Sequence, residues 1–206
     1  QLSAVPVVSA VLGSVAGLPA VQAPLSHFSI MVEGMSQIFP GGPPVVKAAL
    51  GYDITKEELG GDHIHVRESG CVDNLAKDEA DAYEQIRAFL SYLPSNVHEM
   101  APRGDTSDDP ERCEEMLLSA MPRDRRMTYD ARKILRAVVD RNSFFEIAPY
   151  SGRARITGLA RLNRHSVATM PNSPPCNRPS ADRSVDSDTH RTLLPVATVH
   201  MLKLSP

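Results

Sequence analysis

Short apolar runs, separated by turns rich in glycine and proline, mark the beginning of the chain. The runs Val5–Leu12 and Phe28–Val32 contain several β-branched residues, as is typical of buried strands. Between them, a loop at Gly13–Leu18 leads to Pro19, a residue suited to the first turn of a helix. Farther along, the pattern predicts a short helix at Val45–Leu50.

The clearest helical periodicity lies at about Lys77–Leu93 and ends at Pro94. Its apolar residues are three or four positions apart: Tyr83, Ile86, Phe89, Leu90 and Leu93. The segment Ser95–Pro110 has no periodicity and predicts an exposed linker. Asp130 is suited to cap a helix, and Ala154–Leu162 predicts a strand. Strands and helices alternate, so the expected fold class is α/β.

The composition is that of an ordinary globular protein, with 42% hydrophobic and 23% charged residues among 206. The net charge of -3 gives no reason to expect binding to nucleic acid or to anionic membranes. No charge precedes Glu33, but prolines and glycines interrupt this apolar stretch and no basic region leads it. We therefore expect neither a signal segment nor a membrane span.

The cysteines favour a reducing compartment. Cys71, Cys113 and Cys176 are widely spaced and form no CxxC pair, whereas a zinc site needs paired thiolates or histidines at short spacing. We expect no metal in this chain and three reduced thiols in a cytoplasmic protein.

Several segments resemble the carboxyltransferase (β) subunit of propionyl-CoA and related biotin-dependent acyl-CoA carboxylases. The segment VPVVSAVLGSVAG at 5–17 is similar to the strand and oxyanion loop of that family. The segment 54–82 resembles its signature EELGG…HxxxSG…D…DE, with His65, Ser69 and Gly70 in register.

The resemblance continues downstream and spans roughly residues 4–163. The ending LSYLP at 90–94, the segment RMTYDARKILRAVVDRNSFFEI at 126–147 and the segment GLARLN at 158–163 occur in the order of the family. It implies a crotonase-like fold, in which ββα units wind into a superhelix and a complete subunit holds two such domains.

On that basis the chain is expected to be an internal fragment. Residues 1–93 correspond to the C-terminal part of the first domain, 94–122 to a linker, and 123–174 to the beginning of the second domain. Residues 175–206 are expected to be an aberrant or disordered tail.

The resemblance also implies a mechanism. In the family, carboxybiotin on a partner protein gives up CO₂, which the enolate of the acyl-CoA then attacks. The biotin enolate that is left when CO₂ departs and the enolate of the acyl-CoA both carry a negative oxygen. The protein must therefore present preorganised N–H donors. The backbone N–H groups of Gly17 and Leu18 match this position, although the family usually shows Ala-Gly-Gly where this chain has Ala16-Gly17-Leu18. A plain strand-to-helix turn without a ligand is the alternative.

The signature residues receive weaker assignments. His65, Ser69 and Gly70 are expected to be structural or to lie near CoA, because the mechanism requires neither a serine nucleophile nor a metal. The acidic group in the linker is expected to be solvated; it comprises Asp105, Asp108, Asp109 and Glu111.

The expected function is therefore the carboxyltransferase component of a biotin-dependent acyl-CoA carboxylase. The partners implied are the acyl-CoA substrate, a biotin carboxylase or biotin carrier subunit that holds the biotin, and further copies in a homo-oligomer. The fragment alone is expected to be inactive. The alternatives are a non-catalytic scaffold and a biotin-dependent acyl-CoA decarboxylase subunit.

The residues after Asn163 differ in composition from the rest of the chain. The stretch Arg164–Pro206 contains no Gly, Glu or aromatic residue but six of the seventeen prolines, a composition that does not favour a packed core. Where the family shows Gly, Gly and Ala, this chain has Arg164, Ala168 and Pro171, each reachable by one G-to-C base change. One hypothesis is a deteriorating sequence followed by a shifted reading frame; the other is a divergent natural tail.

Overall fold

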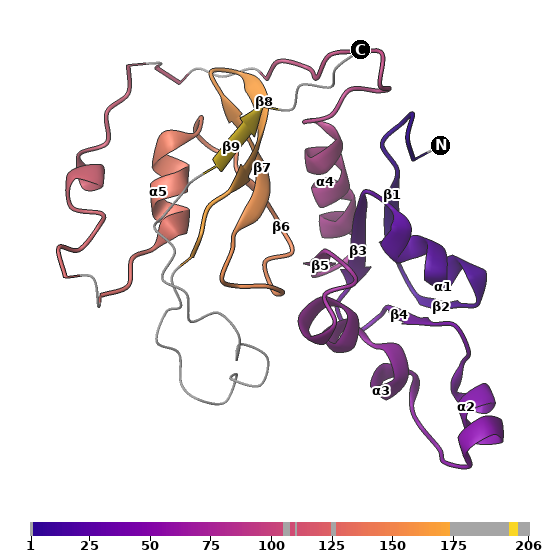
Figure 1. Cartoon of the computed structure of the whole chain (residues 1–206). Coiled ribbons are helices and arrows are strands. Elements are labelled where there is room, and N and C mark those ends of the chain that lie inside the picture. The colour runs from indigo at the N-terminus through magenta and orange to yellow at the C-terminus, as the bar shows by residue number, and fades with distance from the viewer. Residues whose placement is uncertain (1, 105–107, 110, 125–126, 174–197, 202–206) are drawn as a thin grey trace.

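The computed structural model describes residues 2–104, 108–109, 111–124, 127–173 and 198–201. Its elements form two groups, which stand side by side in Figure 1. The first group ends with helix α4 (Glu79–Leu90), and the second begins with helix α5 (Ala131–Val138) after a long irregular connection. The mixed α/β class is confirmed.

In the first group the order strand, strand, helix occurs twice. Its elements are β1 (Val8–Val11), β2 (Ser14–Ala16), α1 (Leu18–Gln22), the 3-10 turn η1 (Ala23–Leu25), β3 (Phe28–Val32), β4 (Gln37–Phe39) and α2 (Pro43–Leu50). Strand β1 pairs in parallel with β3, and β2 pairs in parallel with β4. Two ββα units are thus stacked on each other, as the resemblance predicted for this part of the chain.

Three elements follow before α4. They are α3 (Lys56–Gly60), the π-helical segment η2 (His63–Glu68) and β5 (Asn74–Ala76), which extends the first sheet beside β3. Helix α3 begins at a reciprocal cap, because the Thr55 hydroxyl accepts from the Glu58 N–H while the Glu58 carboxylate accepts from the Thr55 N–H. This hydrogen bonding lowers the pKa of Glu58.

The second group is an antiparallel sheet with α5 beside it (Figure 1). The sheet has the order β6 (Phe145–Ile147), β7 (Thr157–Leu162), β8 (His165–Met170) and β9 (Thr198–Met201). A 3-10 turn, η3 (Glu115–Leu118), precedes α5. The Asp130 carboxylate caps α5 by accepting from the N–H groups of Arg132 and Lys133, which confirms the predicted cap.

A core of aromatic residues joins the two groups. The rings of Phe28 and Phe89 stack with centroids 4.7 Å apart, and Phe145 of the second group meets Phe28 edge-on at 5.6 Å. The buried Asn74 adds polar contacts across the same boundary: its amide donates to the Glu146 carbonyl and accepts from the Ala148 N–H. The groups therefore share one apolar interior.

Several expectations need correction. The loop at Gly13–Leu18 contains strand β2, because Ser14–Ala16 finds a parallel partner in β4. The stretch after Asn163 does contribute to a core: β8 pairs with β7, and Val167 is 1% exposed. Pairing with β7 buries Val167 despite the unusual composition of this stretch.

The tail after residue 173 is described only at 198–201. Strand β9 pairs with β8 there, a long-range contact that the composition did not indicate. The rest of the expected tail lies outside the described residues.

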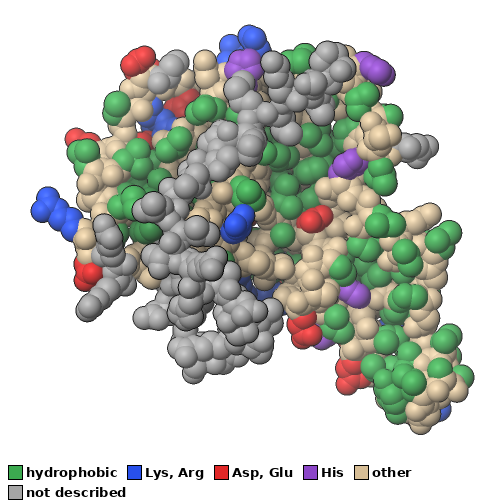
Figure 2. Space-filling model, in the orientation of Figure 1, with side chains coloured by type: hydrophobic (Ala, Val, Ile, Leu, Met, Phe, Trp, Pro, Cys, Tyr) green, Lys and Arg blue, Asp and Glu red, His purple; other side chains and the backbone are tan. Residues whose placement is uncertain are grey.

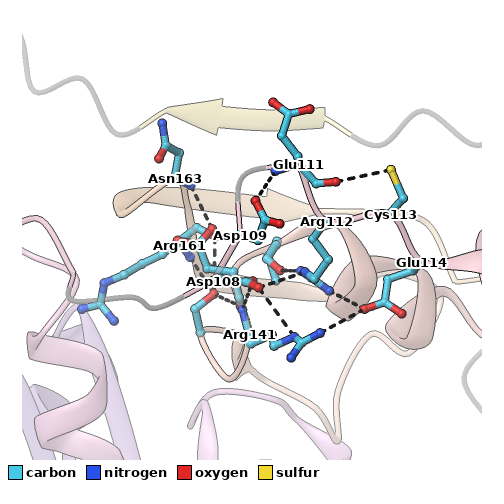
Figure 3. Close-up of polar contacts among 12 residues, drawn as sticks. Asp108, Asp109, Glu111, Arg112, Cys113, Glu114, Arg141, Arg161 and Asn163 are labelled. Atoms are coloured by element: carbon cyan, nitrogen blue, oxygen red, sulfur yellow. Dashed lines mark hydrogen bonds and ion pairs between the residues drawn. The ribbon is translucent and has the colours of Figure 1, made fainter.

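The described residues of the linker segment are irregular, as predicted, but the acidic residues among them are not all solvated (Figure 3). The Asp108 side chain is only 9% exposed, its carboxylate lies 3.1 Å from Nε of Arg112, and it accepts from the Arg141 N–H at 2.9 Å. Arg112 also binds Glu114 at 2.7 Å, which raises the pKa of the guanidinium. The expectation is therefore wrong for Asp108, because it contacts Arg112 four residues later and Arg141 from farther along the chain. Asp105 lies outside the described residues.

Candidate functional site: the Gly17–Leu18 turn

The turn at Gly17 and Leu18 connects β2 to α1. Gly17 has φ 76° and ψ −141°, a conformation that side chains disfavour and glycine adopts readily. Its N–H points at the carbonyl oxygens of Phe39 (3.3 Å) and Pro40 (3.2 Å), at the end of β4. The Gly17 amide therefore holds the turn against β4.

The N–H groups of this turn can be accounted for one by one. Gly17 donates to β4, Pro19 has no N–H, and Ala20 donates to the Gly17 carbonyl at 3.1 Å. The Leu18 N–H has no acceptor among the residues that the structure describes, and the Leu18 residue is 68% exposed. Of the two predicted donors, Leu18 is the one whose N–H is free to meet a ligand.

A polar chain that sequence reasoning missed supports the start of β2. The Ser14 hydroxyl donates to the side-chain carbonyl of Gln37, whose amide in turn donates to the Glu57 carboxylate. These three residues lie on β2, β4 and α3, so the two hydrogen bonds connect β2 to β4 and, through Gln37, to α3. Gln37 is 7% exposed, which shields these bonds from water.

His65 fastens the other side of β4. Its Nε2 lies 2.8 Å from the Ile38 carbonyl, next to the Phe39 carbonyl that receives the Gly17 N–H. A carbonyl can only accept, so Nε2 carries the proton. Its Nδ1 lies 3.2 Å from Sγ of Cys71, a contact that the sequence did not suggest. The contact with the Ile38 carbonyl is thus compatible with the structural role expected for His65.

Ser69 and Gly70 form the exit of η2. The Ser69 hydroxyl is exposed and lies 3.4 Å from the His65 carbonyl. Gly70 has φ 63° and lies so close to Ser151 that a Cβ at this position would collide with that side chain. Gly70 therefore allows the first group to approach the second.

Two features are absent from the described residues. Within the described ranges, no cluster of His, Cys, Asp and Glu is arranged to hold a metal ion. No helix there is both long and apolar enough to cross a membrane.

The family model for the carboxyl transferase domain matches residues 2–181, which is most of the chain. This chain belongs to the carboxyl transferase family. The resemblance predicted from its motifs is thereby confirmed, and the turn at Gly17–Leu18 is a feature of a carboxyl transferase domain.

Curated relatives of this carboxyl transferase domain include two enzyme classes. The methylmalonyl-CoA decarboxylase subunit alpha of Veillonella parvula is 38% identical over 170 residues, covering 82% of this chain and 33% of that protein. The propionyl-CoA carboxylase carboxyltransferase subunit of Haloferax mediterranei is 36% identical over 178 residues, covering 86% and 34%. The chain thus spans about a third of the length of these relatives.

A solved structure of the same family has the same fold. Transcarboxylase 12S, in a crystal structure with hydrolysed methylmalonyl-coenzyme A bound, matches with a TM-score of 0.77 at 30% identity, covering 84% of this chain and 34% of that one. A single-chain, multi-domain long-chain acyl-CoA carboxylase matches with a TM-score of 0.68 at 26% identity, covering 82% and 16%.

Proposed function

We propose that this chain forms part of a carboxyltransferase subunit that transfers CO₂ from carboxybiotin to the α-carbon of an acyl-CoA. The observation that carries the proposal is the Leu18 N–H, which has no acceptor among the described residues, on an exposed residue at the position where the family has its oxyanion loop. Relatives named as propionyl-CoA carboxylase subunits support the substrate class.

The chemistry assigned to the turn needs a backbone donor and no particular side chain. As the α-proton leaves, negative charge develops on the thioester oxygen of the acyl-CoA. The Leu18 N–H donates to that oxygen and lowers the barrier, because a fixed donor does not have to reorient. Gly17 contributes its conformation and its bond to β4, which hold the donor in place. Biotin, when bound, supplies the carboxyl group, and an exposed turn fits its approach on a partner subunit.

The signature residues act one step away from the substrate in this account. His65 holds β4 through the Ile38 carbonyl, and β4 holds Gly17. Gly70 allows the two element groups to approach each other, and Ser69 contacts the His65 carbonyl at the end of η2. All three are positioning residues in the carboxyl transfer, and none is assigned a proton transfer in that reaction.

The proposal places the chain inside a longer subunit. Residues 1–93 and 123–174 belong to successive crotonase-like domains, the ββα units continue into a superhelix, and several copies assemble in the cytoplasm with a biotin carboxylase or biotin carrier partner. The 12S transcarboxylase structure is described as a hexamer assembly, which supports an oligomer.

A second direction of reaction has its own support. The relative from Veillonella parvula is named as a methylmalonyl-CoA decarboxylase subunit. Removing a carboxyl group from an acyl-CoA passes through the same enolate, so the Leu18 donor serves both directions. We propose carboxylation as the main activity and test both.

The test compares the longer subunit with the isolated chain. Each is incubated with the biotin-bearing partner, ATP, isotope-labelled bicarbonate and propionyl-CoA, and separately with biotin carrier and methylmalonyl-CoA. The longer subunit should incorporate label steadily. The isolated chain should show no turnover, because it holds one donor set, and loss of even a single donor costs about a hundredfold or more. A longer subunit that is inactive in both assays contradicts the proposal and favours a scaffold.

A further inference from the structure

We propose that Cys71 is a modification site: its thiol reacts as a nucleophile with small disulfides, and His65 takes the proton that the thiol releases. This inference does not depend on the proposed carboxyl transfer. It concerns the exit of η2, where the imidazole of His65 faces the thiol across 3.2 Å.

The orientation of the imidazole carries the argument. Nε2 donates to the Ile38 carbonyl at 2.8 Å, so in the neutral ring Nδ1 holds the lone pair. That lone pair points at Sγ of Cys71. The arrangement is a nucleophile, a base in hydrogen-bond reach and a third group that orients the base, which together are the requirements of an activated thiol.

Access is the second requirement. Cys71 is exposed, so a small reagent can reach its sulfur. Cys113 is exposed too, but its thiol donates to the Glu111 carbonyl at 3.5 Å and no imidazole contact is found for it in the described part of the chain. The chain therefore contains its own control: two accessible thiols, of which Cys71 has a base beside it.

The reaction is thiol–disulfide exchange. The S–H bond of Cys71 breaks and its proton passes to Nδ1 of His65. The sulfur then attacks one sulfur of the disulfide, a new S–S bond forms, and the old S–S bond breaks. The electron pair of that bond leaves with the released thiolate, so no further oxidant is needed.

The experiment uses dipyridyl disulfide, an uncharged reagent whose released thiopyridone absorbs light. The purified chain carries C176S, so that Cys71 and Cys113 are the reacting thiols, and peptide mass spectrometry assigns each rate. We expect Cys71 to react at least about tenfold faster than Cys113. This ratio is smaller than the full acceleration that a positioned base can give.

Two variants separate the base from the fold. H65Q keeps an amide N–H that can reach the Ile38 carbonyl but has no base at the Nδ1 position; it should slow Cys71 to the rate of Cys113 and leave Cys113 unchanged. H63Q alters the exposed histidine on the same segment and should change neither rate.

Two results would overturn the proposal. One is a Cys71 rate equal to the Cys113 rate in the chain that keeps His65. This comparison needs no histidine variant. The other is an H65Q chain in which Cys71 keeps its advantage. An unfolded H65Q chain is recognised because its Cys113 rate rises to the value in urea, and the first comparison then decides.

Discussion

The guanidinium carbon of Arg161 lies 4.4 Å from the centre of the Tyr92 ring. Tyr92 follows α4 in the first group and is 4% exposed, while Arg161 lies on β7 in the second. The same guanidinium donates to the Ser91 carbonyl at 3.0 Å, and the Tyr92 hydroxyl donates to the Ser143 carbonyl at 2.5 Å. A cation–π contact and two hydrogen bonds thus hold the groups together beside their shared apolar core.

Replacement of Tyr92 by Phe should weaken this junction in a pH-dependent way. Burial raises the pKa of Tyr92, and the nearby Arg161 partly opposes that rise. Because the pKa of Tyr92 is higher in the folded chain than in the unfolded chain, the neutral phenol stabilises the fold at pH values below its unfolded pKa of about 10. This stabilisation is lost as the pH rises through the pKa of the folded state. The hydrogen bond to Ser143 is worth about 1 kcal/mol.

Urea unfolding of the unaltered chain and Y92F measures this. The unaltered chain should be more stable by about 1 kcal/mol at neutral pH, and the difference should shrink above about pH 10. Other groups that titrate in alkali are the same in both proteins, so their effect on stability cancels in the comparison. A difference that stays constant over this pH range would show that folding does not raise the pKa of Tyr92.

Replacement of Gly60 by Ala should destabilise the chain. A Cβ at Gly60 would collide with the Ile38 carbonyl, part of the backbone of β4, whereas a Cβ at Gly13 would meet nothing within 4 Å. Overpacking against backbone costs about 1–3 kcal/mol, so G60A should lose that amount in thermal or urea unfolding. G13A is the matched control and should stay within about 0.5 kcal/mol. Equal stabilities for the two variants would contradict the close approach of α3 to β4.

Replacement of Arg164 by Gly should stabilise the hairpin of β7 and β8. Asn163 (φ 48°) and Arg164 (φ 73°) are both left-handed, as in a type I′ turn, for which Asn-Gly is the preferred pair. The N–H of residue 164 would still bind Asp140, while the side-chain bond to the Gly104 carbonyl would be lost. We expect relief of about 1–2 kcal/mol of backbone strain to outweigh the loss of this partly buried side-chain bond, which is worth about 1 kcal/mol.

We therefore expect R164G to raise the melting temperature by a few degrees. N163G is the control and should change it less, because Asn already tolerates this conformation. A lower melting temperature for R164G would show that the arginine contributes more than its strain costs. A stabilising result supports the hypothesis that a glycine preceded the arginine here. Resequencing past codon 163 tests the reading-frame hypothesis itself.

Some apolar runs in the sequence predicted their elements well. The run Phe28–Val32 is buried at every position, and α2 ends at Leu50 as predicted. The run Val5–Leu12 was predicted less well, because only Val8–Val11 forms a strand and only Val11 of that strand is buried. Strands β2, β4 and β5 were not predicted, because three residues are too few to show alternation. Helix α3 was overlooked even though Thr55 and Glu58 have the spacing of a capping box.

The sequence predicted the strand-to-helix turn of the candidate site, but not the contacts of that turn. The motif located Gly17 and Leu18, but only the fold brings Phe39 to Gly17 and leaves Leu18 as the free donor. In the same way His65 meets Ile38, which is 27 residues away in the chain. Spacing along a sequence does not show which distant carbonyl will accept a hydrogen bond.

The most direct test of the account is removal of the Leu18 N–H. L18P in the longer subunit deletes the donor at the first residue of α1, where proline is well tolerated, and L18A keeps the donor while it shortens the side chain. Circular dichroism and oligomer size check that both variants fold. The account predicts that L18P lowers kcat for label incorporation into propionyl-CoA by about a hundredfold or more, and that L18A stays within a few-fold. A folded L18P subunit that keeps the unaltered rate would contradict the assignment of Leu18 as the oxyanion donor.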